Sequence, residues 1–409
     1  MSATLEPPQT IEPQPSHVDA DGAESPLARL TPEQLEQLGR EFDAIHDDVF
    51  AELGESDARY IRNTIRLHRQ LVLASRLLLL GSRRRELWLL GTSALSLAKI
   101  LENMEIGHNV MHGQWDWMND PDINSQNWDW DTASPADAWR HSHNYEHHTF
   151  TNIRGKDRDL GYEIMRIDPH QKWHPVYLFQ PLYNLLLMGF FEWGVALHDM
   201  NFDAIRSGEK SKRQAREELK AIGAKARRQI VKDYVAFPAL SAAASAALAG
   251  RGRKAGGADR AGAARSAFKS TFRANFASNI VRNVWAYSII FCGHFPDQTY
   301  TFSEDEVAEE SRGGWYVRQL LGAANIDGHA PFHFLSGNLS FQVEHHLFPD
   351  MPSSRYAEVA PRVREVCKRY GLPYNTGPLS KQLGTVHRTI LRLAFPGGKV
   401  RPKPGPYSG

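Results

Sequence analysis

Cysteine is nearly absent from this chain of 409 residues, which contains only Cys292 and Cys367. Two cysteines exclude a fold held together by several disulfides, and they exclude a zinc or iron–sulfur site built from thiolates. A surplus of one charge is also missing, because 48 Lys and Arg balance 47 Asp and Glu. That balance excludes a protein that binds nucleic acid through its overall charge, so we expect no nucleic-acid partner.

Long apolar runs are scarce. Only residues 173–191 continue for more than 18 positions without Asp, Glu, Lys or Arg, and residues 234–250 reach 17. A helix that crosses a bilayer needs about 20 mostly apolar residues. Hydropathy alone therefore gives limited support for a membrane protein.

The pattern of a signal peptide is lacking at the N-terminus. The first 26 residues contain five prolines and several acids, with no apolar centre. We expect residues 1–30 to form a disordered tail. The whole chain is 42% hydrophobic, which is enough for a packed core in the remainder.

Helical patterns fill most of that remainder. Over residues 31–52 apolar side chains recur at helical spacing, and Thr31 and Gln34 are placed to form a capping box. The pattern predicts an all-α fold, with a flexible Gly-, Ala- and Arg-rich connector at 251–270 and a loose C-terminal tail at 381–409. Further helices are expected at 59–82, 87–112, 175–197, 206–232, 234–250, 272–295 and 353–370.

Histidine is the exception in an otherwise ordinary composition, with 18 residues. Histidines four apart on a helix share a face, so both imidazoles can reach one metal ion or two neighbouring ions. Other histidines lack a partner of this kind, and we expect them to have structural or surface roles. The clusters are His108 with His112, His143 with His147 and His148, and Gln342 with His345 and His346; the isolated ones are His141, His170, His174, His329 and His333.

Seven histidines and a glutamine are too many ligands for one metal ion. Imidazole suits iron, copper, zinc and nickel, and two irons with open positions fit a site that activates oxygen. A ferritin-like di-iron site needs two Glu-x-x-His motifs, and this chain offers one, Glu105–His108. We therefore expect Glu105 to lie one turn from the ligands and to orient them.

The segments GHNVMHGQW, WRHSHNYEHHTFTN and FQVEHHLFP resemble the three histidine boxes of the membrane fatty acid desaturase superfamily. With FEWGVAL, KDYVAFPAL and FCGHFPD, they are most similar to the actinobacterial acyl-CoA delta-9 (stearoyl-CoA) desaturases. The resemblance covers roughly residues 30–380 and implies one desaturase domain at 31–380. It adds His294 to the iron ligands. The third box begins with Gln342 instead of histidine, and a neutral amide is a weaker ligand than imidazole. Three alternatives are therefore open for Gln342, which are binding through its oxygen, binding through water, and no binding.

The resemblance implies an oxygen-dependent desaturase that uses two iron ions to insert a cis double bond, at delta-9, into an acyl-CoA or acyl-lipid chain. Electrons would come from NADPH through a separate flavin/iron–sulfur oxidoreductase, because the chain has no Gly-rich dinucleotide motif and no cysteine cluster. Two alternatives remain. One is an acyl or lipid hydroxylase on the same di-iron scaffold, and the other is a zinc-binding membrane protein.

The boxes must meet on one side of a membrane, which requires an even number of crossings between them. We expect a multi-pass cell-membrane protein with about four transmembrane helices, and a cytosolic helical cap that holds the metal site. Residues 175–197 would lie in the interface or pack against the cap. The charge bias opposes this orientation, because 83–85 and 251–254 are basic and fall on the non-cytosolic side. The expected spans are 62–82, 87–107, 232–250 and 272–293.

Two further segments have two interpretations each. Five of the ten tryptophans lie in 115–139, where they would form either a wall of the acyl tunnel or an aromatic belt at the bilayer surface. The basic run 210–228 favours a solvated or lipid-facing surface over a site for coenzyme A phosphates.

Overall fold

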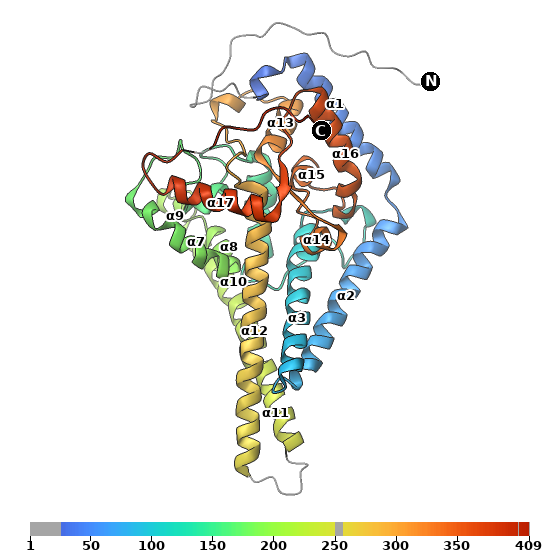
Figure 1. Cartoon of the computed structure of the whole chain (residues 1–409), viewed down its shortest axis with the longest axis vertical. Coiled ribbons are helices and arrows are strands. Elements are labelled where there is room, and N and C mark those ends of the chain that lie inside the picture. The colour runs from blue at the N-terminus through green and yellow to red at the C-terminus, as the bar shows by residue number, and fades with distance from the viewer. Residues whose placement is uncertain (1–25, 250–256, 400, 409) are drawn as a thin grey trace.

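The computed structural model describes residues 26–249, 257–399 and 401–408. Figure 1 shows an elongated molecule in which long helices form a stem and shorter helices gather into a cap at one end. The helical prediction is confirmed. Among the described residues the strands are β1 (Asn325–Asp327) and β2 (Thr376–Pro378), which pair in parallel. The predicted tail lies outside the described residues except at its end, where η1 (Pro26–Arg29) is a short 3₁₀ helix.

The stem consists of long helices, of which α3 continues into a π-helix at its end and α11 follows directly from one. Helix α3 packs against both α2 and α12, and α11 packs against α12 (Figure 1). The stem elements are α2 (Glu55–Leu80), α3 (Arg85–Leu101), the π-helix η2 (Glu102–His108), the π-helix η7 (Val231–Ala236), α11 (Phe237–Ala249) and α12 (Gly257–His294).

The cap begins with α1 (Pro32–Glu52), whose start confirms the predicted capping box. The Thr31 hydroxyl accepts from the Gln34 amide at 3.3 Å, and the Gln34 side-chain oxygen accepts from the Thr31 amide at 2.9 Å. This exchange satisfies two amides that the first helical turn leaves unpaired. The other cap elements are α13 (Arg312–Gly322), α14 (Ala330–Leu335), α15 (Gln342–Leu347), η8 (Asp305–Val307), η9 (Ser353–Arg355), α16 (Tyr356–Arg369) and α17 (Leu379–Leu393).

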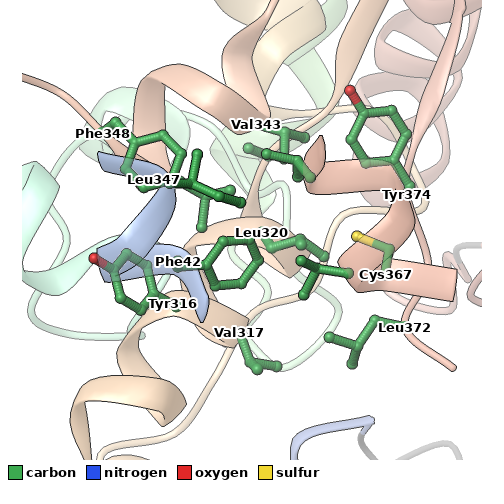
Figure 2. Close-up of a cluster of buried hydrophobic side chains, with 14 of the residues drawn as sticks. Phe42, Tyr316, Val317, Leu320, Val343, Leu347, Phe348, Cys367, Leu372 and Tyr374 are labelled. Carbon is green, nitrogen blue, oxygen red and sulfur yellow. The ribbon is translucent and has the colours of Figure 1, made fainter. Parts of the chain in front are cut away.

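The cap has its own hydrophobic core, which surrounds Phe42 of α1. Figure 2 shows Tyr316 and Leu320 of α13 beside Phe42, with Phe348 close by. The ring centroids of Phe42 and Tyr316 are 5.1 Å apart. This core joins α1, α13, α15 and α16, and so it fixes the short helix that carries the third histidine box.

The remaining helical elements lie between η2 and η7 in the chain. They are α4 (Asn109–Met111), η3 (Asp116–Met118), α5 (Ala136–Trp139), the π-helix η4 (Arg140–His147), α6 (His148–Phe150), η5 (Leu160–Glu163), η6 (Pro175–Phe179), α7 (Gln180–Gly189), α8 (Phe191–His198), α9 (Phe202–Ser207) and α10 (Lys212–Ile230).

Three local predictions were wrong. The connector at 251–270 is helical from Gly257 onward, because Ala, Arg and Lys favour a helix more than its few glycines oppose one. The apolar segment 175–197 is broken at Phe190 rather than continuous. The tail at 381–409 contains most of α17, whose apolar face packs on α7 and α12. Residues 251–256 of the connector lie outside the described residues.

No helix formed by the described residues combines the length and the apolar composition that crossing a membrane would require.

Candidate metal centre

The first histidine pair lies where the stem meets the cap. Helix α3 ends in the π-helix η2, whose last residue is His108, and His112 follows α4. Their ring centroids are 4.5 Å apart. Gly107 allows this geometry, because a Cβ there would lie 2.7 Å from the carbonyl oxygen of Glu102 and 3.2 Å from Trp130.

The second box lies on another π-helix, η4. His143 and His147 stack with ring centroids 5.0 Å apart, and His148 begins α6. The rings of His148 and His346 stack at 4.6 Å, and the His148 ring lies 4.7 Å from that of His112. His148 therefore stands between the first and third boxes.

The third box is α15, buried under the core of the cap. His345 and His346 are fully buried. His294 enters from the last residue of α12, with its ring 4.9 Å from His346 and 4.7 Å from His147. Four stretches that are distant in sequence thus converge on one place: 108–112, 143–148, 294 and 342–346.

The converging side chains form two groups, in each of which the candidate ligand atoms lie within 4.8 Å of one another. A carboxylate, Asp159, forms a further overlapping group with His143 and His147. The first group is His108, His112, His143 and His345, and the second is His147, His294 and His346. The structure brings together every histidine that the sequence proposed as a ligand.

The unpaired atoms of this cluster fit a metal site. Buried polar groups normally have a hydrogen-bond partner. Here several buried imidazole nitrogens have no hydrogen-bond partner among the described residues. Nitrogens that bind a cation would be free of hydrogen bonds in the same way. These atoms are Nε2 of His112, His143, His147, His345 and His346, both nitrogens of His148, and Nδ1 of His294.

In four of these rings the other nitrogen, Nδ1, forms a hydrogen bond with a residue outside the two histidine groups. His147 Nδ1 lies 3.0 and 3.1 Å from the two carboxylate oxygens of Asp157. The other three Nδ1 atoms are paired as His143 with Asp159 at 3.2 Å, His345 with the Tyr356 hydroxyl at 3.2 Å, and His346 with the Gln319 amide oxygen at 2.8 Å. A bond at Nδ1 orients a metal-binding imidazole and leaves Nε2 free for the ion.

Sequence reasoning missed these outer partners. Asp157 and Asp159 follow the second box closely, which is a weak signal because acidic residues are common. Asp159 also lies 2.9 Å from Nε2 of His198, so one carboxylate joins His143 to a histidine of α8.

Burial keeps most of the cluster neutral, which is the form that binds a metal. Burial lowers the pKa of His108 to about 3. It also holds the pKa values of His112, His345 and His346 well below the usual range. For His147 burial lowers the pKa, but the carboxylates of Asp157 and Asp159 outweigh it and the net pKa is raised.

Gln342 lies inside the cluster. Its side-chain nitrogen is 3.1 Å from Nε2 of His294, and its buried oxygen has no partner among the described residues. Gly293 provides the space, because a Cβ there would lie 2.9 Å from that oxygen. Gln342 is therefore placed to offer its oxygen to the second group.

The expectation for Glu105 was wrong. Its carboxylate contacts no histidine among the described residues, and it accepts hydrogen bonds from the hydroxyls of Tyr60 at 2.7 Å and Ser353 at 2.9 Å. His108 instead pairs with the adjacent Asn109 at 3.0 Å. The reason is that the π turn places Glu105 on the side of the helix facing α2 and η9.

The isolated histidines lie outside both groups. The His141 side chain is 68% exposed and faces Glu146 at 3.4 Å. His333 pairs with Ser340 at 2.7 Å. His174 and His329 accept from backbone amides at the starts of η6 and α14, and His170 lies in the loop before η6.

A cavity opens beside the cluster and reaches His108, His143 and His294. Its wall is mainly apolar and includes Met104, Trp130, Trp139, Tyr162, Phe191 and Ile290. Trp130 and Trp139 thus line a cavity, whereas Trp115 is buried against Tyr60, with ring centroids 6.1 Å apart.

The basic run at 210–228 forms α10. Lys225 and Arg228 pair with Asp129, and Lys210 pairs with Glu218. These pairs support the interpretation of the run as a surface rather than a phosphate site.

Comparison with known proteins agrees with this geometry. Residues 86–378 match the family model described as fatty acid desaturase. The NADPH-dependent stearoyl-CoA 9-desaturase of Mycobacterium tuberculosis is 46% identical over 375 residues, which cover 92% of this chain and 83% of that protein. The sn-1 linoleoyl-lipid 6-desaturase of Synechocystis is 25% identical over 72% of this chain and 76% of that protein. No solved structure matches.

Proposed function

The chain belongs to the fatty acid desaturase family, and from that premise we propose that it inserts a cis double bond at carbon 9 of a long-chain acyl-CoA. It is an oxidoreductase. The M. tuberculosis relative named as a stearoyl-CoA 9-desaturase covers nearly the whole chain, whereas the Synechocystis relative named for a lipid substrate is more distant. This difference favours acyl-CoA over acyl-lipid as the substrate.

One observation supports the proposal most directly. Two groups of buried imidazoles, with nitrogens that have no hydrogen-bond partner among the described residues, lie beside a mainly apolar cavity. The cavity is enclosed on several sides by Met104, Trp139 and Phe191, and most of its exposed wall area is apolar, as in sites that bind apolar ligands. An acyl chain has no group that ionises near the bond to be attacked. Position alone must select its carbon, and a rigid apolar wall supplies position.

We assign one iron to each group. The ligands would be His108, His112, His143 and His345 for one ion, and His147, His294, His346 and Gln342 for the other, with His148 between them. When bound, the iron pair would supply the oxidising chemistry: O₂, two electrons and two protons, with one hydrogen taken from each of two adjacent methylenes, give the cis double bond and two waters.

The chain itself orients the ligands and excludes water. Asp157, Asp159, Tyr356 and Gln319 hold the imidazoles by Nδ1. Trp139 closes one side, with its ring 4.6 Å from His143 and 5.3 Å from His108. A dry wall protects a reactive site from side reactions with solvent.

Electrons would come from NADPH through a separate flavin/iron–sulfur oxidoreductase. The printed name of the M. tuberculosis relative includes dependence on NADPH. This sequence carries no Gly-rich dinucleotide motif and only two cysteines, both buried.

We place the protein in the cell membrane, with four spans in the stem and the metal site facing the cytosol. Large apolar side chains on the outer faces of the stem support this placement, because water would not favour them. They include Leu73, Leu77, Leu89, Leu90, Leu240 and Leu248, each at least 47% exposed. Exposed Leu182, Leu185 and Leu186 of α7 fit a helix lying in the interface.

The test is gas chromatography–mass spectrometry of products formed from stearoyl-CoA by the purified chain with NADPH and a cognate reductase. The His345→Ala variant is the control. We expect a monounsaturated acid with its double bond at carbon 9, absent from the variant, and about two irons per chain. A hydroxy acid would establish the hydroxylase instead, and one zinc per chain would overturn the di-iron assignment.

A further inference from the structure

A layer of buried charges crosses the stem next to the cavity. Arg282 of α12 forms an ion pair with Glu192 of α8, and their side chains are 1% and 4% exposed. The amide of Gln229 donates to the same carboxylate at 2.8 Å. Arg282 also donates to the carbonyl oxygen of Asp131 at 3.2 Å.

The layer continues through α2, α3, η7 and α12. Asp233 of η7 is fully buried and accepts from Lys99 of α3 at 2.8 Å and from Arg76 of α2 at 2.9 Å. Asn275 of α12 donates to the Asp233 carbonyl. Charges buried between helices are costly unless they are paired, and here each has a partner of opposite sign.

Only one part of this layer touches the cavity. Glu192 lines the cavity wall, as does Thr132. Arg282 and Gln229 contact Glu192 from behind and, like Lys99, Arg76 and Asp233, do not line the cavity themselves. Arg282 precedes His294 by twelve residues on the same helix, a separation of about 18 Å along the axis. Arg282, and with it the paired Glu192, therefore lies well away from His294.

We propose that Glu192, held in place by Arg282 and Gln229, forms the end of the acyl cavity and sets the longest chain that the enzyme accepts. This inference rests on the proposed acyl substrate. The wall receives the methyl end rather than the coenzyme A head, because its charges are buried and already paired. Phosphates would need cations that are free to bind them.

A charged cavity wall and an apolar one differ in the free energy needed to move their side chains and admit a longer acyl chain. An apolar side chain can change rotamer to admit an additional methylene. Separating a buried ion pair leaves two uncompensated charges, and the burial of a few more methylenes does not offset that cost. We therefore infer a sharp upper limit on chain length.

The test compares turnover of palmitoyl-, stearoyl-, arachidoyl- and behenoyl-CoA by the full-length, iron-loaded protein. The variant Arg282→Met/Glu192→Ala/Gln229→Leu replaces the whole group with smaller or apolar side chains. We expect its ratio of arachidoyl to stearoyl turnover to rise by about tenfold. The control Arg76→Met/Asp233→Asn alters the same layer away from the cavity and should keep the wild-type ratio.

Thr132→Ile tests the opposite direction and remains informative if the triple variant does not fold. Thr132 lines the cavity beside Asp131, and its hydroxyl has no partner among the described residues, so no hydrogen bond is lost. We expect the ratio of stearoyl to palmitoyl turnover to fall.

An unchanged chain-length profile in a triple variant that still turns over stearoyl-CoA would overturn the inference, as would an unchanged ratio in Thr132→Ile. If the wild type forms no unsaturated product from any of the four substrates, the proposed function fails instead.

Discussion

Gln342 packs directly on Gly293: a Cβ at Gly293 would lie 2.7 Å from the Gln342 Cγ. The glycine is therefore part of the second ligand group although it offers no ligand. We predict that Gly293→Ala displaces Gln342, lowers iron from two ions per chain, and reduces desaturation by roughly tenfold or more. Metal analysis and turnover of stearoyl-CoA measure both effects.

The control for that variant lies on the same helix. Gly262 is exposed, and nothing would contact a Cβ placed there. Gly262→Ala should retain iron and activity. Full iron and activity in Gly293→Ala would show that Gln342 has no part in the site.

Asp157 is the carboxylate most closely bound to a candidate ligand. In the wild type, the backbone amide of Asn152 donates to Asp157 at 2.7 Å, and the Asp157→Asn side chain can still accept this bond. The variant loses the negative charge that orients His147. We expect iron affinity or activity to fall roughly 10- to 100-fold. Glu209→Gln removes an exposed acid and should change neither, so equal effects from the two variants would contradict the prediction.

His141 and His143 are neighbours in sequence with different surroundings. The His141 side chain is 68% exposed, whereas that of His143 is 12% exposed and faces the other ligands. We predict that His143→Ala loses iron and activity, whereas His141→Ala retains both. Loss of iron from purified His141→Ala would require a revised ligand set.

Gly313 is where α13 meets α1. A Cβ there would lie 1.8 Å from the Leu35 carbonyl oxygen, which is backbone and cannot move aside easily. We expect Gly313→Ala to destabilise the cap by about 1–3 kcal/mol and to lower the Tm. Gly314→Ala is the matched control, because its nearest contact is the flexible side chain of Glu310 at 3.2 Å.

The link between His46 and Asp350 makes part of the stability depend on pH. The hydrogen bond to Asp350 raises the pKa of His46 above its ordinary value of 6.5, even though burial lowers it. The folded state therefore holds this proton more tightly than the unfolded chain does. Its contribution to the unfolding free energy is complete below about pH 6.5 and is lost as the pH rises through the higher, folded-state pKa.

Thermal unfolding measured between pH 5.5 and 8.5 in the same detergent tests this linkage. The difference in Tm between the wild type and Asp350→Asn should shrink as the pH rises. A difference that grows with pH would have the opposite sign and would exclude the linkage.

The box histidines could be predicted from the sequence because i, i+4 pairs on helices are a local pattern. His294 came from family resemblance, since a single histidine has no spacing to interpret. The outer partners could not be predicted. Tyr356 and Gln319 reach His345 and His346 only through the packing of the cap.

The wrong predictions have a common cause. Glu105 was assigned by α-helical geometry, but the segment is a π-helix. The connector and the tail were predicted to be irregular because they contain glycines and prolines. Helix propensity in the connector and an apolar face in the tail instead make them helical. Local composition does not show what a segment packs against.

The π-helical segments η2 and η4 make the metal centre sensitive to chain length. A π turn holds one residue more than an α turn. Deleting a single residue from η2 would restore the α-helical phase and rotate His108 and His112 by about 100° relative to α3. Single-residue insertions and deletions here should therefore be far less tolerated than substitutions, because they change the direction in which the ligands point.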